Sequence, residues 1–198
     1  MSIAILVLAA GKSTRMQSIK QLEKVGNKRL LNITLEKANQ LQKSNIYCVL
    51  GANASLIKKS IVFHNIQTIS NDKYTNGLST SIIAGLKYFE EHDLNFDAVF
   101  ILLADQPAID EEYLSSMKNL HLNNPSKIIA TPYKTHFGVP VIIPKTYFKS
   151  LLTINGDKGA KSFINEHKTE VLSSNLQTNN IDIDTQEELK LYRKSILK

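Results

Sequence analysis

The chain carries LAAGKSTRMQSIKQL at residues 8–22, directly behind the short apolar run Ile3–Leu8. A buried strand that ends here would pass into a loop of small residues, whose backbone N–H groups are open to anionic oxygens. Three cations follow at staggered distances along this loop, namely Lys12, Arg15 and Lys20. The stretch therefore predicts a polyphosphate site at the end of the first strand.

The spacing of this loop differs from two common phosphate-binding motifs. Walker A places Gly-Lys-Ser/Thr after a glycine and a four-residue spacer, and the dinucleotide fingerprint is Gly-x-Gly-x-x-Gly. Here Lys12 and Ser13 follow the single glycine Gly11. A tight turn with solvated cations would explain a lone Ala-Ala-Gly, but the whole string favours another kind of nucleotide-binding loop.

Outward from this loop, short apolar runs alternate with segments that carry apolar residues at helical spacing. Strands are expected at Ile3–Leu8, Ile46–Leu50, Ile66–Ile69, Ala98–Leu103, Lys127–Thr131 and Val139–Ile143. Helices are expected at Leu30–Gln42, Ser55–Phe63, Ser79–Glu90, Asp110–Leu120, Lys158–Glu166 and Thr185–Ile196, with a polar loop at Ser173–Asn180. This alternation predicts a mostly parallel, Rossmann-like sheet with helices on both faces, a three-layer α/β/α sandwich in one domain over residues 1–198.

Composition narrows the class of protein. The 198 residues are 42% hydrophobic, enough for one sizeable core. The formal charge is +6, but the cations are spread along the chain, so small anionic substrates explain it better than a nucleic-acid surface. Cys48 lies in an apolar run and predicts a buried thiol, which agrees with a reducing cytoplasm. The apolar start has no preceding cation and no apolar run could span a bilayer, so neither a signal peptide nor a membrane partner is expected.

Asp105 comes directly after the apolar residues Val99–Leu103. Because ligands of such sheets bind at the carboxyl ends of the strands, its carboxylate is expected beside the phosphate loop. A carboxylate there suits Mg²⁺, which takes oxygen ligands and shares substrate phosphates. From the residue types alone, the start of a turn is an equally good interpretation of Asp105, since Asp also begins turns and Pro107 follows.

A second acidic element precedes the last expected helix. Residues 181–185 alternate apolar and acidic side chains, which predicts a short strand with Asp182 and Asp184 on one side. Asp or Thr before Gln-Glu-Glu-Leu is also an expected helix N-cap. We therefore assign the metal chiefly to Asp182.

Residues 8–20 resemble the N-terminal signature of the MobA-like nucleotidyltransferases, Leu-Ala-(Ala/Gly)-Gly-x-Ser-x-Arg-Met followed closely by lysine. The matching residues are Leu8, Ala9, Ala10, Gly11, Ser13, Arg15, Met16 and Lys20. The Ala-Ala-Gly form and the following Lys-Gln-Leu resemble the cytidylyltransferase branch of the family. Gln17 stands where the family usually has glycine, so a stiffer or differently shaped loop is expected after Met16.

The resemblance extends over essentially the whole chain. Asp105-Gln106-Pro107 matches the second motif of the family, and Asp182, Asp184, Thr185, Glu187 and Leu189 match its closing motif, with Gln186 and Glu188 in place of Pro and Asp. The resemblance implies Mg²⁺ at Asp105 and Asp182. It also implies that Arg15, Lys20 and Asp105 are catalytic, with the two cations neutralising phosphate charge.

Further binding residues follow from the same resemblance. The implied nucleotide-binding residues are Leu8, Ala9, Ala10, Gly11, Lys12, Ser13, Arg15, Lys20, Asn71, Gly77, Ser79, Ser81 and Asp105. The ordinary alternative for Ser79 is a helix cap, and for Gly85 close helix packing. The implied acceptor-binding residues are Gly138, Pro140, Gly156 and Asp157, where Asp157 could equally cap a helix. Val139 and Lys161 depart from the histidine and arginine that the family has in these elements.

The activity that the resemblance implies is transfer of CMP from CTP to a phosphorylated acceptor, most often molybdopterin, with release of pyrophosphate. Its expected partners are CTP, that acceptor and, transiently, a molybdoenzyme. Two alternatives remain open: a guanylyl- or other cytidylyltransferase that uses a different phosphate acceptor, and a non-catalytic chaperone that binds and delivers molybdenum cofactor.

Overall fold

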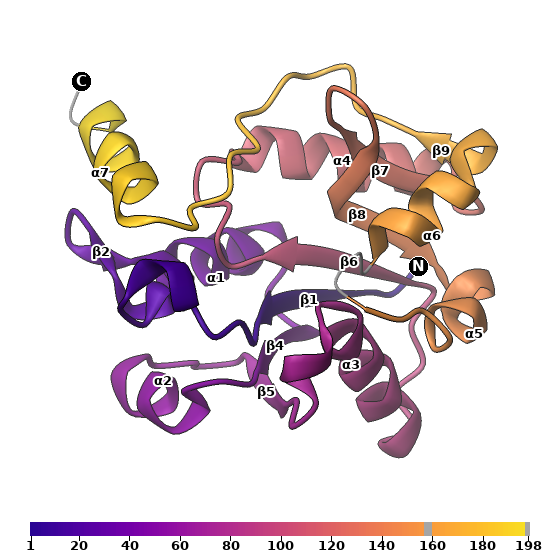
Figure 1. Ribbon diagram of the computed structural model, residues 1–198. Coiled ribbons are helices and arrows are strands. Elements are labelled where there is room, and N and C mark those ends of the chain that lie inside the picture. The colour runs from indigo at the N-terminus through magenta and orange to yellow at the C-terminus, as the bar shows by residue number, and fades with distance from the viewer. Residues whose placement is uncertain (157–159, 197–198) are drawn as a thin grey trace.

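The computed structural model describes residues 1–156 and 160–196 (Figure 1). Its main sheet has seven strands in the order β5-β4-β1-β6-β8-β7-β9. They are β1 (Ile3–Ala9), β4 (Ile46–Leu50), β5 (Gln67–Ser70), β6 (Ala98–Leu103), β7 (Ile128–Pro132), β8 (Phe137–Pro144) and β9 (Val171–Leu172), beside a small hairpin of β2 (Lys24–Val25) and β3 (Lys28–Arg29). The helices are α1 (Leu30–Leu41), α2 (Ala54–Ser60), α3 (Ser79–Glu91), α4 (Glu111–Asn123), α5 (Phe148–Leu151), α6 (Ala160–Glu166) and α7 (Gln186–Ser195).

The direction of the strands confirms the predicted, mostly parallel sheet. Strands β5, β4, β1 and β6 pair in parallel, whereas β8 is antiparallel to both β6 and β7. Strand β7 again pairs in parallel with β9. The carboxyl ends of β1 and β6 therefore lie side by side, which brings the loops that follow them together.

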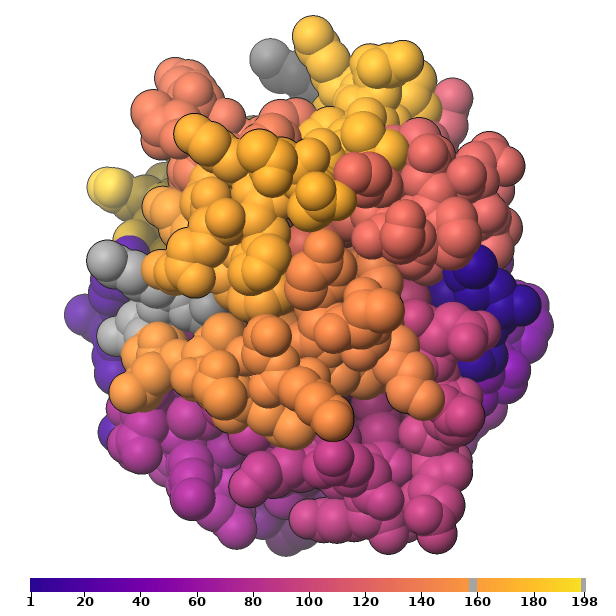
Figure 2. Space-filling model, turned by 90° about the vertical axis from the view of Figure 1, so that its right-hand side faces the viewer, coloured from indigo at the N-terminus to yellow at the C-terminus, as the bar shows by residue number. Residues whose placement is uncertain are grey.

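Alternating side chains of β1 supply two separate cores, as expected for a strand buried on both faces. Ile5 and Val7 belong to a cluster that includes residues of α1, α2 and α4, whereas Leu6 and Leu8 belong to one with residues of α3, α5 and α6. Figure 2 views the side where the orange chain around α5 and α6 lies between the magenta chain around α3 and the salmon chain around α4. The three-layer α/β/α architecture is confirmed.

Close packing at Gly85 agrees with the sequence interpretation. A Cβ atom at Gly85 would lie 2.6 Å from Leu6 Cδ2, so a larger residue would push α3 away from the sheet. Cys48 is fully buried, as predicted, and burial raises the pKa of its thiol. No helix among residues 1–156 and 160–196 is long and apolar enough to cross a membrane.

One local prediction is wrong, and one alternative interpretation does not hold. Residues 181–184 form no strand, because alternation alone cannot supply a neighbouring ladder; the Ile183 N–H instead donates to the Asp105 carbonyl at 2.8 Å. Ser79 is not a helix cap, because Leu78 occupies the N-cap position and Ser79 lies inside the first turn, with its hydroxyl lacking a partner among the described residues. The cap of α7 is Thr185, which forms a reciprocal capping box with Glu188. The helix expected at Lys158–Glu166 begins outside the described residues and is seen as α6.

A third small core ties α7 to the loop that follows β1. It contains Met16, Val25, Leu30, Ile183 and Leu189. The Gln186 side chain also donates to the Met16 carbonyl at 3.0 Å. The C-terminal helix therefore anchors the loop that the sequence analysis assigned to phosphate.

Candidate active site

A cavity of about 450 Å³ opens at the carboxyl ends of β1 and β6. Its walls come from four separate parts of the chain: the loop after β1, the start of α3, the residues after β6, and the segment before α7. The phosphate loop and the two acidic elements therefore meet in one place, as the strand order requires.

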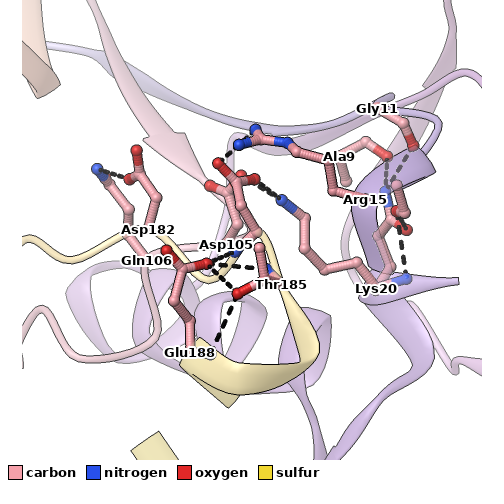
Figure 3. A network of polar contacts seen from close by, with 12 residues as sticks. Ala9, Gly11, Arg15, Lys20, Asp105, Gln106, Asp182, Thr185 and Glu188 are labelled. Carbon is pink, nitrogen blue, oxygen red and sulfur yellow. Dashed lines mark hydrogen bonds and ion pairs between the residues drawn. The ribbon is translucent and has the colours of Figure 1, made fainter. Parts of the chain in front are cut away.

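Lys20 lies at the centre of the polar groups in this cavity. Its Nζ donates to Asp105 Oδ2 at 2.7 Å and to Asp184 Oδ1 at 2.8 Å. Arg15 Nη2 donates to the other oxygen of Asp184 at 2.7 Å (Figure 3). In this arrangement the cations of the loop neutralise the carboxylates. A bound triphosphate would take the place of the carboxylates as the partner of Arg15 and Lys20. A divalent cation would take the place of these two side chains as the partner of the carboxylates.

The charges shift the pKa values of both partners. Burial alone would lower the pKa of Lys20, but Asp105 and Asp184 outweigh it and the pKa is raised. Burial alone would raise the pKa of Asp184, but Lys20 and Arg15 outweigh it and the pKa is lowered. Both groups are therefore charged at neutral pH. Asp184 lines the cavity and the N-cap of α7 is Thr185, so the helix-cap alternative does not hold for the Asp184 side chain.

The buried side chain of Gln21 fixes the shape of the phosphate loop through hydrogen bonds. Gln21 was not among the predicted site residues. Its amide nitrogen donates to the carbonyls of Ala9 at 2.9 Å and Gly11 at 3.1 Å. Its oxygen accepts from the Ser13 hydroxyl at 3.3 Å, and Ser13 in turn accepts from the Lys20 N–H at 3.2 Å. Gln21 is only 3% exposed, and this burial, which the sequence does not signal, is what fits it to the role.

Gln17 adopts the backbone conformation that glycine favours. Its φ is 55° and that of Ser13 is 58°, so both residues lie in the left-handed region. The loop therefore keeps a glycine-like turn after Met16, although glutamine makes that turn more costly.

The carboxylates fit a hard divalent cation. Asp105 Oδ1 is buried and has no hydrogen-bond partner among the residues that the structure describes, which is costly unless a ligand satisfies it. Burial and then the charge of Asp105 raise the pKa of Asp182, as expected for acids that share a space. Within residues 1–156 and 160–196, no three Asp, Glu, His or Cys side chains form a ready-made cage. One or two carboxylates are enough to hold a divalent cation that substrate phosphates also bind.

The predicted site residues divide into those on the cavity wall and those behind it. On the wall lie Leu8, Ala9, Ala10, Gly11, Ser13, Arg15, Lys20, Gly77, Ser81, Asp105 and Asp182. Lys12 instead lies with its Nζ 5.7 Å from the centre of the Tyr74 ring. Asn71 is buried behind the wall, where its amide donates to the hydroxyls of Thr80 and Ser81 at 2.9 and 3.0 Å. Unpredicted wall residues include Tyr74, Leu78 and Asp184.

Gly51 packs against Ala10 and leaves no room for a side chain at position 51. A Cβ atom at Gly51 would lie 2.8 Å from the Ala10 carbonyl oxygen and 2.7 Å from Tyr74 Cβ. The Ala10 carbonyl also accepts from the Ala52 N–H at 3.1 Å. The lack of a side chain at Gly51 therefore allows the phosphate loop and the Tyr74 segment to approach each other.

Of the residues assigned to the acceptor, the three that the structure describes, Gly138, Pro140 and Gly156, are not on the wall of this cavity. Gly138 packs against the Tyr133 ring, where a Cβ atom at Gly138 would lie 2.8 Å from Tyr133 Cε2. The Pro140 carbonyl accepts from the Thr131 hydroxyl at 2.9 Å, and the Gly156 carbonyl accepts from the Ser79 N–H at 3.4 Å. Asp157 lies outside the described residues. Acceptor binding by these residues stays a prediction.

Comparison with known proteins identifies the family. Residues 5–171 match the model of the MobA-like NTP transferase domain. The chain belongs to the MobA-like NTP transferase family. Among curated relatives of this family member, the bifunctional protein GlmU of Pseudomonas putida (strain GB-1) is 31% identical over 119 residues, which cover 59% of this chain and 25% of GlmU. The GlmU of Clostridioides difficile (strain 630) is 28% identical over 142 residues, 71% of this chain and 29% of that protein. The chain thus spans about a quarter of the length of these relatives.

Solved structures share the fold. Rv0371c of Mycobacterium tuberculosis H37Rv, in complex with manganese, has a TM-score of 0.81 at 21% identity and covers 98% of this chain and 100% of that one. The 4-diphosphocytidyl-2C-methyl-D-erythritol synthase of Anaerococcus prevotii DSM 20548 has a TM-score of 0.73 at 19% identity, and the match covers 100% of this chain and 96% of that one. These likenesses confirm the Rossmann-like α/β fold of the MobA-like family member.

Proposed function

We propose that this chain is a Mg²⁺-dependent nucleotidyltransferase that transfers CMP from CTP to a phosphorylated acceptor, molybdopterin, and releases pyrophosphate. The observation that carries the proposal is the cavity in which Arg15 and Lys20 face Asp105, Asp182 and Asp184. Cations on one side suit a triphosphate, and carboxylates on the other suit the divalent cation that accompanies it.

The reaction needs no protein nucleophile. An oxygen of the acceptor phosphate attacks the α-phosphorus of CTP and forms a new P–O bond. The bond between the α-phosphorus and the oxygen that bridges it to the β-phosphorus breaks, so that the β- and γ-phosphates leave as pyrophosphate. Catalysis of this kind is positioning and charge neutralisation. When bound, Mg²⁺ supplies positive charge to the phosphate oxygens.

Each charged side chain has a role in this proposal. Arg15 binds the β- and γ-phosphates, helped by the amides of the loop after β1. Lys20 leaves Asp105 and Asp184 and binds the α-phosphate as negative charge builds there. Asp105, once released from Lys20, would hold the metal together with Asp182, whose carboxylate accepts from Gln106. The ion pairs in the structure keep these side chains close to where the reaction needs them.

The choice of CTP rests on the Ala-Ala-Gly form of the loop and on the polar groups beside it. Ala10 is the position at which the resemblance distinguishes the cytidylyltransferase branch. Gly77 and Ser81 line the same cavity and would offer backbone and hydroxyl hydrogen bonds to a pyrimidine edge. Hydrogen bonds of this kind reject a wrong base more sharply than shape does.

The deciding experiment measures pyrophosphate release with each of the four nucleoside triphosphates, with and without molybdopterin and Mg²⁺. We expect turnover with CTP, molybdopterin and Mg²⁺ together. A preference for GTP would overturn the cytidylyl assignment. No turnover with any combination, in a folded protein that binds nucleotide, would favour a binding and delivery protein.

A variant tests the metal site independently. Asp105→Ala should abolish turnover that depends on the metal and leave the protein folded, because Asp105 is partly exposed in the cavity. The matched control is Asp110→Ala, since Asp110 caps α4 by accepting from the Tyr113 N–H and is not on the cavity wall. Normal rates in Asp105→Ala would remove Asp105 from the metal site.

A further inference from the structure

Gln106 stands directly after Asp105, yet its side chain turns away from Lys20 and toward a different carboxylate. Its amide nitrogen donates to Asp182 Oδ1 at 2.8 Å and to the Tyr133 hydroxyl at 2.8 Å. Figure 3 shows Gln106 and Asp182 together on one side of Asp105, with Arg15 and Lys20 on the other. Gln106 is 4% exposed, so water cannot readily take over these bonds.

Tyr133 determines which end of the Gln106 amide faces Asp182. The Tyr133 hydroxyl donates to the Val139 carbonyl at 2.6 Å, and a carbonyl can only accept. Because a hydroxyl has a single proton, Tyr133 must accept from Gln106, and the group that faces it must be the amide NH₂. The same NH₂ has its second proton left for Asp182.

The resulting chain of hydrogen bonds runs in one direction, from Gln106 outward to both partners. Burial raises the pKa of Tyr133 to about 12, so its hydroxyl keeps the proton that it donates to Val139 at neutral pH. The β7–β8 hairpin, through Tyr133 and Val139, therefore fixes a glutamine that lies beside the metal site.

Asp182 needs such a partner because of its surroundings. Its carboxylate is partly buried close to Asp105, and the two negative charges repel each other. A hydrogen bond to Oδ1 holds the carboxylate in place and leaves Oδ2 for the cavity that Asp182 lines. In metal sites, partners of this kind orient the ligand and tune its affinity.

We infer that Gln106 is a positioning residue: its amide, oriented by Tyr133, holds the Asp182 carboxylate in the geometry that binds the divalent cation. This inference rests on the metal component of the proposed function. It adds Gln106 and Tyr133, neither of which touches the substrate phosphates in the proposed reaction.

The test is Mn²⁺ binding to the nucleotide-free protein, measured by electron paramagnetic resonance titration. Gln106→Leu and Tyr133→Phe should each weaken Mn²⁺ binding, Gln106→Leu by about 10-fold or more, as is typical when a partner of a metal ligand is lost. CTP binding without metal should be unchanged in both. The matched control is Tyr113→Phe, because the Tyr113 hydroxyl is buried without a hydrogen-bond partner among the described residues.

The same substitutions in an Asp182→Asn background separate positioning from a general structural effect. If Gln106 acts through Asp182, Gln106→Leu should weaken Mn²⁺ binding in the wild type and have little further effect in Asp182→Asn. Equal losses in both backgrounds, or no loss in either, would overturn the inference. If Asp182→Asn itself binds Mn²⁺ as the wild type does, the metal assignment of the proposed function fails instead. Should Gln106→Leu not fold, Tyr133→Phe carries the comparison.

Discussion

Replacing Lys20 by methionine should tighten the binding of a divalent cation to the nucleotide-free protein. Lys20 occupies Asp105 Oδ2 at 2.7 Å and Asp184 Oδ1 at 2.8 Å, so a cation that approaches these carboxylates must compete with it. The Lys20 side chain is 12% exposed, so solvent screens this competition only in part. Methionine keeps much of the apolar stem and removes the charge.

The size of the effect follows from these contacts. A hydrogen bond to a charged group contributes about 1.5–3 kcal/mol. Removing the one to Asp105 should therefore strengthen Mn²⁺ binding by about tenfold or more, since 1.4 kcal/mol corresponds to a factor of ten. Turnover should nevertheless fall, by about 100-fold or more, because the positive charge at the α-phosphate is lost.

The assay is a Mn²⁺ titration of the nucleotide-free protein, followed by thermal unfolding with and without Mn²⁺. Mn²⁺ should stabilise Lys20→Met more than the wild type, because binding to the folded state raises stability. Lys12→Met is the matched control: it removes the same charge from the same loop, but Lys12 is exposed and lies over the Tyr74 ring. Weaker or unchanged Mn²⁺ binding in a folded Lys20→Met protein would refute the competition between Lys20 and the metal.

Three predictions concern stability. Gln17→Gly should raise the free energy of unfolding by about 0.5–1 kcal/mol, because glycine relieves the left-handed φ of 55° at an exposed position; a loss of stability in urea unfolding would contradict this. Gly85→Ala should lower it by about 1–3 kcal/mol, because the added methyl would lie 2.6 Å from Leu6 Cδ2, and a neutral result would show that α3 shifts easily. His121 is fully buried, and burial lowers its pKa, so the unfolded chain takes up a proton that the folded chain resists. Stability should therefore fall as the pH drops below about 6.5, by at most about 1.4 kcal/mol per pH unit. Urea unfolding of His121→Leu between pH 8 and 5 should show a smaller fall than the wild type, and an identical fall would assign the pH dependence to other groups.

Much of the fold could be predicted because its signals are local. Runs such as Ile46–Leu50 are apolar throughout, which is typical of a strand covered on both faces. The alternation of such runs with amphipathic segments then leaves few topologies. The strand β9, with two residues, and the helix α5, with four, carry no comparable pattern. Segments this short do not show a repeat of apolar residues from which their structure could be predicted.

The same distinction applies to the candidate site. Arg15, Lys20 and Asp105 stand out in the sequence because their residue types follow strands, and the sheet brings the ends of these strands together. Gln21 and Gln106 do not, because glutamine is common on surfaces and nothing local shows that these two are buried. Their roles depend on carbonyls and carboxylates supplied by other parts of the fold.

The sequence by itself thus determined the layered α/β architecture and the presence of a phosphate loop and two acidic elements. Only the tertiary structure decided how these elements are paired. Lys20 and Asp184 are 164 residues apart in the chain, and their contact depends on α7 docking against the loop through Met16 and Leu189. Local propensity and periodicity act over a few residues, whereas an ion pair depends on where the packed core places both side chains.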